Sequence, residues 1–513
     1  MMFLKKNKIE IIFAIFVGFL YFFFRLLYLD SMPIFTDEAI YVRWAQIALN
    51  DASWRYISLT DGKQPLFVWT AMIFMKFISD PLIAGRVVSV STGFLTMIGV
   101  WFLTIELFKN KKIAYLSSIL YVFYPFAQIN DRMALMDSMV ATFSIWAFYF
   151  SIKLIKKTRF DFVYTLGVVM GLGALTKSSN FFSQYLLPFT ILLFDFSRKN
   201  TLRRLLKWVV FALISIFIAQ IIYNTLRLSP LFQMVQAKNA TFVYPFSEWV
   251  NHPFTFFVGN LYGLFDWLIQ YLKLPYVLLV ILSLIFINKF TKEKILLIIY
   301  FLLPFTALAL FGKVIFPRFI FFMSCFLLPL AGWGLNEIIG FVDKRLNKKK
   351  KNILSTVVYI VVTVIFVAYP GFVSFKVASD PINAPIVRSD SRQYVNSWAA
   401  GWGVNESVEF FKKEAKNKKI FIATEGTFGL MPEALELYLI NNKNITIKGY
   451  WPVEHSLAKE TIEYSKKMPS YFVFYQPNNQ IINQDYPLEL VFQVRSGNSD
   501  YFYRVYKIIP PKE

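Results

Sequence analysis

The feature that most constrains this chain is a series of long apolar segments separated by short basic ones. They lie at residues 9–29, 82–108, 113–128, 134–154, 162–175, 181–196, 205–226, 274–287, 295–311, 314–339 and 353–372. Most approach the roughly 20 residues that a helix needs to cross a bilayer. Hydrophobic residues make up 56% of the 513 positions, more than soluble domains carry. The sequence therefore predicts a polytopic α-helical membrane protein with about 11 transmembrane helices.

The formal net charge of +22 has a topological explanation. If the N-terminus is cytoplasmic and each segment crosses once, every dense Lys/Arg loop lies inside: residues 5–8, 109–112, 153–159, 197–204, 288–294 and 343–351. This is the pattern of the positive-inside rule. It requires residues 65–78, which are too short to span comfortably, to form a helix in the outer interface. Basic cytoplasmic loops, rather than nucleic-acid binding, thus explain the charge.

This topology predicts a membrane domain over residues 1–372, with outer loops at 30–81 and 227–273, and an extracytoplasmic domain over 373–513. Runs with period two predict strands in the last part: residues 419–426, 445–451, 471–477, 488–494 and 501–508. Helical patterns at 403–416 and 431–440 make this a small α/β domain. It must fold without a disulfide, because Cys325 is the single cysteine of the chain.

Two adjacent acids follow the first apolar segment, in the stretch PIFTDEAIYVRWAQIAL (residues 33–49). If Thr36 caps a helix, the residues at three- and four-residue spacing from Asp37 are apolar: Ile40, Tyr41, Trp44, Ile47 and Ala48. A carboxylate on an apolar face is costly without a partner or a role. Glu38 points about 100° away, and the helix dipole accounts for an acid there. We therefore predict a functional role for Asp37 and leave Glu38 open between the two explanations.

A second acid and a set of cations lie at the same predicted level. Asp137 is in the outer turn NDRMALMDS, where a simple interfacial pair with Arg132 is the alternative explanation. Lys63, Arg86, Lys177 and Arg318 occur at outer ends of segments. Any one of them could extend to lipid head groups. Together, beside acids, they predict an anion site, and phosphate is the anion at that depth that arginine binds bidentately.

These motifs resemble, in order and spacing, those of polyprenyl-phosphate-dependent GT-C glycosyltransferases. The nearest patterns are those of protein O-mannosyltransferases and lipid A aminoarabinose transferases. The resemblance covers residues 9–200 and is carried by FTDEAIYVRWAQ, GKQPLFVWTAMI, AGRVVSV, RMALMDS and GALTKSS. It implies a GT-C bundle with interfacial helices in the first outer loop. The implied activity is inverting transfer of one sugar from a polyprenyl-phosphate donor to an acceptor hydroxyl of an exported protein, a lipid or a glycan.

The resemblance also implies roles for single residues. Asp37 matches the acid that activates the acceptor hydroxyl, and Asp137 matches the second family acid. Lys63, Arg132 and Lys177 match basic positions near the donor phosphate, and Arg86 and Arg318 match more loosely. Gln64 and Ser178 depart from the family pattern. The acid that precedes the lysine in the aminoarabinose enzymes is Gly62 here, so we favour a reaction without a metal ion and keep His252 as an alternative ligand.

Other readings of the sequence stay open. A secondary transporter or flippase-like protein for a lipid-linked or anionic substrate is the alternative function, but it should carry ionisable residues near the bilayer midplane. A non-catalytic surface protein that displays its C-terminal domain would not need Asp37 on an apolar face. Tyr394, Trp398 and Trp402 are candidates for stacking on an acceptor sugar, or for packing of the domain against the bundle. No Gly-rich phosphate loop is present, so no nucleotide is implied.

Overall fold

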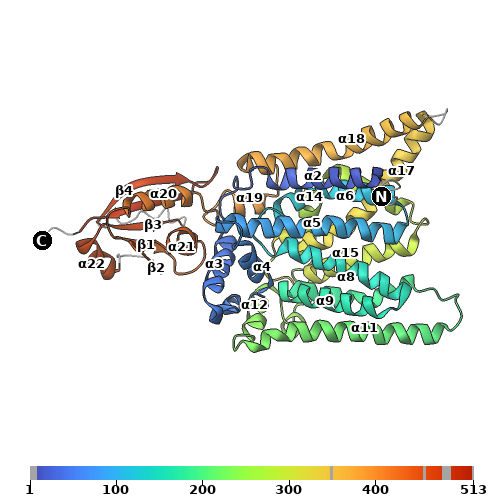
Figure 1. Cartoon of the computed structure of the whole chain (residues 1–513), viewed down its shortest axis with the longest axis horizontal. Helices are drawn as coiled ribbons and strands as arrows, with labels where there is room; N and C mark the ends of the chain where they lie inside the picture. Colours follow the sequence, from blue (N-terminus) through green and yellow to red (C-terminus); the bar gives the residue numbers. More distant parts are fainter. Residues whose placement is uncertain (1–7, 347–350, 454–457, 476–486, 511–513) are drawn as a thin grey trace.

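The protein is described by a computed structural model over residues 8–346, 351–453, 458–475 and 487–510. A helical bundle carries a sheet domain at one end (Figure 1). Helices α3, α4 and α12 lie at the end of the bundle nearest this domain, and the N-terminus lies toward the other end. The region between bundle and domain is therefore built from the residues of the two predicted outer loops.

The bundle consists of long helices interrupted at a few prolines. Its helices are α2 (Lys8–Leu26), α5 (Pro81–Phe108), α6 (Lys111–Val122), α7 (Pro125–Asn130), α8 (Asp137–Lys157), α9 (Phe160–Thr176), α10 (Phe182–Leu186), α11 (Thr201–Tyr223), α14 (Phe257–Ile285), α15 (Thr291–Phe311), α16 (Phe321–Ser324), α17 (Leu328–Leu346) and α18 (Asn352–Ser379). Short 3-10 helices extend them at η3 (Ser178–Phe181), η4 (Leu187–Leu193), η5 (Asn224–Leu228), η6 (Pro317–Ile320), η7 (Cys325–Leu327) and η8 (Pro381–Asn383).

Seven helical stretches in the described part of the chain are long and apolar enough to cross a membrane, and two shorter apolar helices accompany them. The remaining predicted segments are broken. Segment 113–128 is divided between α6 and α7 before Pro125, since proline cannot continue a helix without losing a hydrogen bond. Segment 181–196 forms three short pieces. Segment 274–287 is not one of these broken segments, because it is the second half of α14, one of the seven long stretches, beyond a kink at Lys273.

The predicted outer loops contain short helices. These are α3 (Thr36–Asn50), η1 (Ala52–Trp54), η2 (Ile57–Asp61), α4 (Leu66–Phe74), α12 (Met234–Phe242) and α13 (Phe246–Trp249). Helix α3 begins after Phe35 rather than after Thr36, whose hydroxyl donates to the Ala399 carbonyl instead of capping the helix. The prediction of Thr36 as the cap is therefore wrong by one residue, because a long-range partner takes its side chain.

The C-terminal domain confirms the predicted strands and helices. Its elements are α19 (Arg388–Tyr394), α20 (Val404–Glu414), β1 (Ile420–Glu425), α21 (Glu433–Leu439), β2 (Ile445–Tyr450), α22 (Lys459–Lys467), β3 (Ser470–Phe474), β4 (Leu488–Arg495) and β5 (Phe502–Ile508). The strand order is β2-β1-β3-β5-β4. Strands β2, β1 and β3 run parallel, and β5 pairs antiparallel with β3 and β4. The result is a mixed sheet with helical crossovers.

The domain is attached to the start of α3 by backbone hydrogen bonds. The amide of Gly401 donates to the Ile34 carbonyl at 2.7 Å, and the amide of Thr36 donates to the Ala399 carbonyl at 3.1 Å. Farther along α3, the Arg43 guanidinium pairs with Glu436 of α21 at 2.8 Å. Helix α3 is consequently covered on one side by the bundle and on another by the domain.

Candidate active site

Asp37 lies in the first turn of α3 and forms an ion pair with Arg318. The Asp37 Oδ2 and Arg318 Nη2 atoms are 2.8 Å apart, and the two side chains are 22% and 9% exposed. Arg318 comes from η6, nearly 300 residues farther along the chain, and its guanidinium lies 5.5 Å from the Phe35 ring centre. The fold thus brings the first predicted acid and the last predicted cation together.

The surroundings of Asp37 keep it ionised. Burial opposes its negative charge and would raise its pKa. The positive charges of Arg318, Lys63 and Lys177, together with the Arg318 hydrogen bond, outweigh burial and hold the pKa of Asp37 below its usual value. Asp37 is therefore a carboxylate at neutral pH, and it can accept a proton or a hydrogen bond.

A cavity of about 390 Å³ opens beside this ion pair, within the size range of small-molecule sites. Its polar wall includes Lys63, Asp137, Lys177, Lys238 and Arg318. Its other wall is apolar and comes from α12, from the C-terminal half of α15 and from the rings of Phe319 and Phe322. An anionic group with an apolar tail would find both kinds of surface in this one cavity.

The cations of the cavity are balanced to different degrees. Lys177 pairs with Asp137 at 2.7 Å, and Lys238 pairs with Asp61 at 2.6 Å. Lys63 has no ion pair with a carboxylate among the described residues, and its ammonium lies 5.3 Å from the centre of the Phe242 ring. Burial lowers the pKa of Lys63 to about 8, although Asp37 acts in the opposite direction. Three of the predicted phosphate-binding cations, Lys63, Lys177 and Arg318, therefore share the cavity.

Glu38 and Arg86 lie elsewhere, in a closed and fully buried contact. Both carboxylate oxygens of Glu38 accept from Arg86, at 2.9 and 2.8 Å. The same carboxylate accepts from the amides of Phe35 and Ala134. Arg86 donates its remaining hydrogens to the carbonyls of Leu29, Met32 and Pro33. With every donor and acceptor used, this pair fixes the start of α3 to α5 and has no free group for a substrate.

Arg132 also lies outside the cavity and serves the bundle. Its guanidinium donates to four carbonyls at the end of α2: Phe24, Arg25, Leu27 and Tyr28. A cation at a helix C-terminus satisfies otherwise unpaired carbonyls and complements the helix dipole. The structure therefore separates Glu38, Arg86 and Arg132 from Asp37, although all were predicted for one site.

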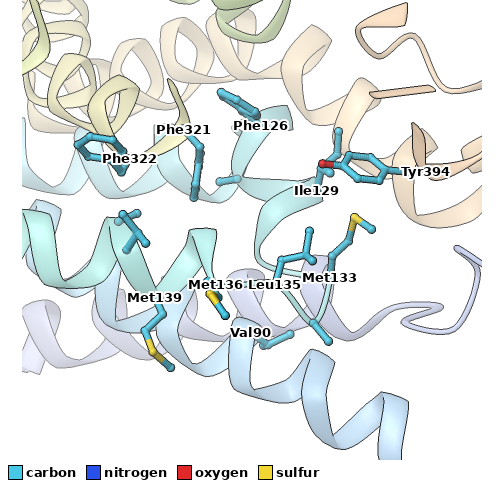
Figure 2. Packing of buried hydrophobic residues seen from close by; sticks show 14 of the residues in the cluster. Val90, Phe126, Ile129, Met133, Leu135, Met136, Met139, Phe321, Phe322 and Tyr394 are labelled. Carbon is cyan, nitrogen blue, oxygen red and sulfur yellow. The ribbon is translucent and has the colours of Figure 1, made fainter. Parts of the chain in front are cut away.

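The three C-terminal aromatic candidates occupy different surroundings. Tyr394 is buried, and its ring packs edge-on against Phe35 at 5.0 Å. Figure 2 shows its hydroxyl pointing toward Ile129. Trp402 donates to the Val395 carbonyl and is half-buried against the core. Only Trp398, at 37% exposed, presents a ring to the outside, beside Tyr475. Tyr394 thus belongs to the seam between domain and bundle, whereas the hydrogen bond of Trp402 lies within the domain.

No group of three or more His, Cys, Asp or Glu side chains in the described ranges could hold a metal ion. His252 is 4.0 Å from Glu248 and contacts the ring of Tyr244. Gly62 has a left-handed backbone, with φ of +64°, and a Cβ there would lie 2.2 Å from the Met234 carbonyl oxygen. An acid at position 62 would therefore displace α12.

Several residues of the cavity were not predicted. Tyr41, one turn after Asp37, is buried in the cavity wall. Ser178 accepts hydrogen bonds from Gln64 and Asn239, and so links the segments 30–81 and 227–273. The helical spacing of the sequence already placed Tyr41 on the same face as Asp37, so its position near the site could have been predicted. No sequence pattern indicated Lys238 or Asn239, because they lie on a short helix in an aromatic-rich loop.

Part of the chain that lines the cavity is similar to a known protein family. Residues 62–223, which include Lys63, Asp137 and Lys177, match the family described as dolichyl-phosphate-mannose-protein mannosyltransferase. Curated protein sequences give no match.

Solved structures share the fold. ArnT from Cupriavidus metallidurans in the apo state has a TM-score of 0.63 at 13% identity, covering 99% of this chain and 100% of that one. The same protein bound to undecaprenyl phosphate has a TM-score of 0.62 at 12% identity, with equal coverage. The archaeal oligosaccharyltransferase AglB from Archaeoglobus fulgidus, with an inhibitory peptide and a dolichol-phosphate, has a TM-score of 0.55 at 11% identity, covering 91% and 69%. Residues 62–223 are therefore similar to the dolichyl-phosphate-mannose-protein mannosyltransferase family, and the chain as a whole shares the fold of ArnT and AglB.

Proposed function

We propose that the chain moves a single sugar from a polyprenyl phosphate to an acceptor hydroxyl, with inversion, and that Asp37 is the catalytic base. The observation that carries the proposal is the Asp37–Arg318 pair at the edge of a cavity that also holds Lys63, Lys177 and Lys238. A carboxylate and an excess of cations beside an apolar wall fit a donor that has an anionic head and a lipid tail.

The charges of the cavity suit the leaving group. A phosphate monoester leaves with additional negative charge, and fixed cations stabilise charge that develops in the transition state. Lys63 is the cation best placed to bind the phosphate, because no carboxylate among the described residues pairs with it and its burial makes a new anionic partner favourable. Lys177 remains tied to Asp137 and would hold that acid beside the donor.

Asp37 suits the acceptor side of the reaction. Inversion needs one base on the face of the sugar opposite the leaving group, and such a base contributes about 10²–10⁴-fold to the rate. The cations around Asp37 keep it unprotonated, so it is ready to take the hydroxyl proton. The acceptor itself is an exported protein, a lipid or a glycan.

The proposal includes the membrane topology. The dense basic loops lie inside if about 11 segments cross, with α6–α7 and α10–η4 as broken crossings and α3 and α4 in the outer interface. The cavity and the C-terminal domain are then extracytoplasmic. A transporter is not favoured, because α3, which carries Asp37, and α4, which begins three residues after Lys63, lie at the end of the bundle nearest the C-terminal domain instead of near its middle (Figure 1).

The test is transfer of radiolabelled sugar from a panel of polyprenyl-phosphate donors by the purified protein. We expect Asp37→Asn to lower the rate by about 10²–10⁴-fold while thermal unfolding is unchanged. Asp51→Asn is the matched control, because Asp51 is an exposed acid at the other end of the same helix, and it should retain the wild-type rate. Unreduced transfer by Asp37→Asn would remove Asp37 as the base, and solute flux without transfer by any donor would replace the enzyme with a transporter.

A further inference from the structure

A second buried carboxylate lies close to Arg318 and has no part in the mechanism above. Asp390 is 1% exposed and lies on α19, the first helix after η8 on the way to the sheet domain. Tyr271 of α14 donates its hydroxyl to Asp390 Oδ2. The other oxygen, Oδ1, is buried and has no hydrogen-bond partner among the described residues. A buried carboxylate oxygen without a partner is costly and calls for an explanation.

Arg318 has unpaired hydrogen-bond donors, which complement the unpaired acceptor of Asp390. Its Nη2 atom is used by Asp37, but Nε and Nη1 are buried and have no partner in the described part of the chain. The guanidinium holds five N–H donors in a rigid plane, so a second carboxylate can pair with it while the first remains bound or leaves. Unpaired donors of Arg318 and an unpaired acceptor of Asp390 therefore occur in one buried region.

Two observations place Asp390 beside Arg318. Arg318 and Tyr394 both contact the ring of Phe35, and Tyr394 is one helical turn after Asp390 on α19. Residues four apart share a face of a helix, so Asp390 faces the same region. The electrostatics agree, because the charge of Arg318 lowers the pKa of Asp390 and the charge of Asp137 raises it.

We infer that Asp390 is a positioning residue for the transfer reaction: it is an alternative carboxylate partner for Arg318, and exchange of Arg318 from Asp37 to Asp390 frees Asp37 to take the acceptor proton. This rests on the proposed function of Asp37. While Arg318 holds Asp37, it uses one lone pair of the base and depresses its basicity. When Arg318 turns to Asp390, both effects are removed. The unpaired Asp390 oxygen then accepts a hydrogen bond from the guanidinium.

The exchange gives the reaction a dependence on pH. Burial raises the pKa of Asp390 to about 7, against the Tyr271 hydrogen bond and the charge of Arg318. The titratable and charged groups that face Asp390 are Tyr271, Arg318, Asp137 and Tyr394. As pH rises through about 7, Asp390 ionises and competes for Arg318, so kcat should rise. Below that pH, Arg318 stays on Asp37.

The test measures kcat against pH for the purified full-length protein. We expect Asp390→Asn to lower kcat at pH 8 by roughly 10- to 100-fold and to abolish the rise near pH 7, with the donor KM nearly unchanged. Tyr271→Phe removes a hydrogen bond that favours the ionised form of Asp390. The rise of kcat in this variant should therefore occur at higher pH than in the wild type. Asp380→Asn is the control, because Asp380 is a half-buried acid two helices earlier that pairs with Lys376, and its profile should match the wild type.

The outcomes separate this inference from the proposed function. An Asp390→Asn profile that keeps the rise, or a Tyr271→Phe profile with an unmoved midpoint, would overturn the role of Asp390 while leaving Asp37 as the base. Absence of transfer by the wild-type protein with every polyprenyl-phosphate donor would instead overturn the proposed function. If Asp390→Asn fails to fold, the Tyr271→Phe midpoint decides the question.

Discussion

Asp37 and Glu38 are neighbours in the sequence, yet their surroundings give them different chemistry. Glu38 accepts four hydrogen bonds and has a fully buried arginine as its partner. Asp37 has one arginine partner, Arg318, which lines the cavity, and the Asp37 side chain is 22% exposed. A group that is completely satisfied stabilises the fold, whereas a group that is partly satisfied can still bind a substrate. The distinction lies in contacts made by residues 86, 134 and 318, far along the chain.

Lys63 provides a prediction at the scale of a single residue. Its pKa is lowered to about 8, so the side chain is positively charged below that pH and neutral above it. A hydrogen bond to a charged group contributes about 1.5–3 kcal/mol, so we expect kcat/KM for the donor to fall by roughly tenfold or more as pH rises through 8. The parameter kcat/KM reports the ionisation of the free enzyme, and it is measured with a polyprenyl-phosphate sugar at fixed ionic strength.

The control is Lys63→Arg, whose guanidinium stays charged throughout this range. Its kcat/KM should lack the fall near pH 8, even if its absolute value is lower. The same fall in both proteins would assign the ionisation to another group and remove Lys63 from the phosphate site.

At the scale of elements, the position of Lys63 depends on how η2 ends. Gly62 follows η2 with a left-handed φ of +64°, and α12 packs directly on it. A Cβ at position 62 would lie 2.2 Å from the Met234 carbonyl oxygen and 2.6 Å from Lys238 Cβ. The glycine therefore allows η2 to pack against α12, so that Lys63 and Lys238 line one cavity.

We expect Gly62→Ala to lower the free energy of unfolding by about 1 kcal/mol or more and to raise the donor KM, because α12 must move. Gly263→Ala is the matched control: Gly263 lies within α14, and a Cβ there meets no atom within 4 Å. Alanine should stabilise that helix by up to about 1 kcal/mol. Thermal unfolding in detergent and donor kinetics on both variants check this, and equal KM values for wild type and Gly62→Ala would contradict it.

The sequence predicts elements better than it predicts the site. Period-two runs identified all five strands, because each strand alternates between buried and exposed faces or forms a short apolar run. Helical spacing placed Tyr41 and Trp44 on the buried face of α3 with Asp37. Helical spacing did not predict that Glu38 is buried, because it assumes that one face of a helix is exposed and places Glu38 on that face. Helix α3 is covered on several sides by segments that are distant in sequence.

The same reason explains the predicted cations. Arg86 and Arg132 have the residue type and the chain position of a phosphate ligand, and spacing alone cannot distinguish them from Arg318. What distinguishes them is the set of backbone carbonyls that each one meets. Those carbonyls belong to the segment 24–33, whose path depends on the completed bundle. Long-range packing therefore decides which arginines remain available for a substrate.

At the scale of the whole molecule, the C-terminal domain directly contacts α3, the helix that carries the proposed base. It contacts α3 through the Ile34–Gly401 and Thr36–Ala399 hydrogen bonds, next to Asp37, and through the Arg43–Glu436 ion pair two turns later. Trp44 also lies beside Phe428 of the domain, with ring centres 6.1 Å apart. If the bundle served only to display this domain on the surface, the domain would not need to contact α3 both beside Asp37 and two turns later.

The Arg43–Glu436 contact tests this coupling by charge exchange. Arg43→Glu places a like charge against Glu436, and Glu436→Arg does the same to Arg43, so each should lower transfer several-fold by shifting α3 at Asp37. The double variant restores an opposite pair and should recover most of the activity, since residues in direct contact give non-additive effects of about 0.5–3 kcal/mol. The exposed Lys448–Glu460 pair, at 52% and 42% exposed, is the control, and the same exchange there should leave transfer unchanged. Transfer rates of the three variants of each pair are compared with the wild-type rate. If the double variant Arg43→Glu/Glu436→Arg is impaired by the sum of its two single effects, the domain does not position α3 through this pair.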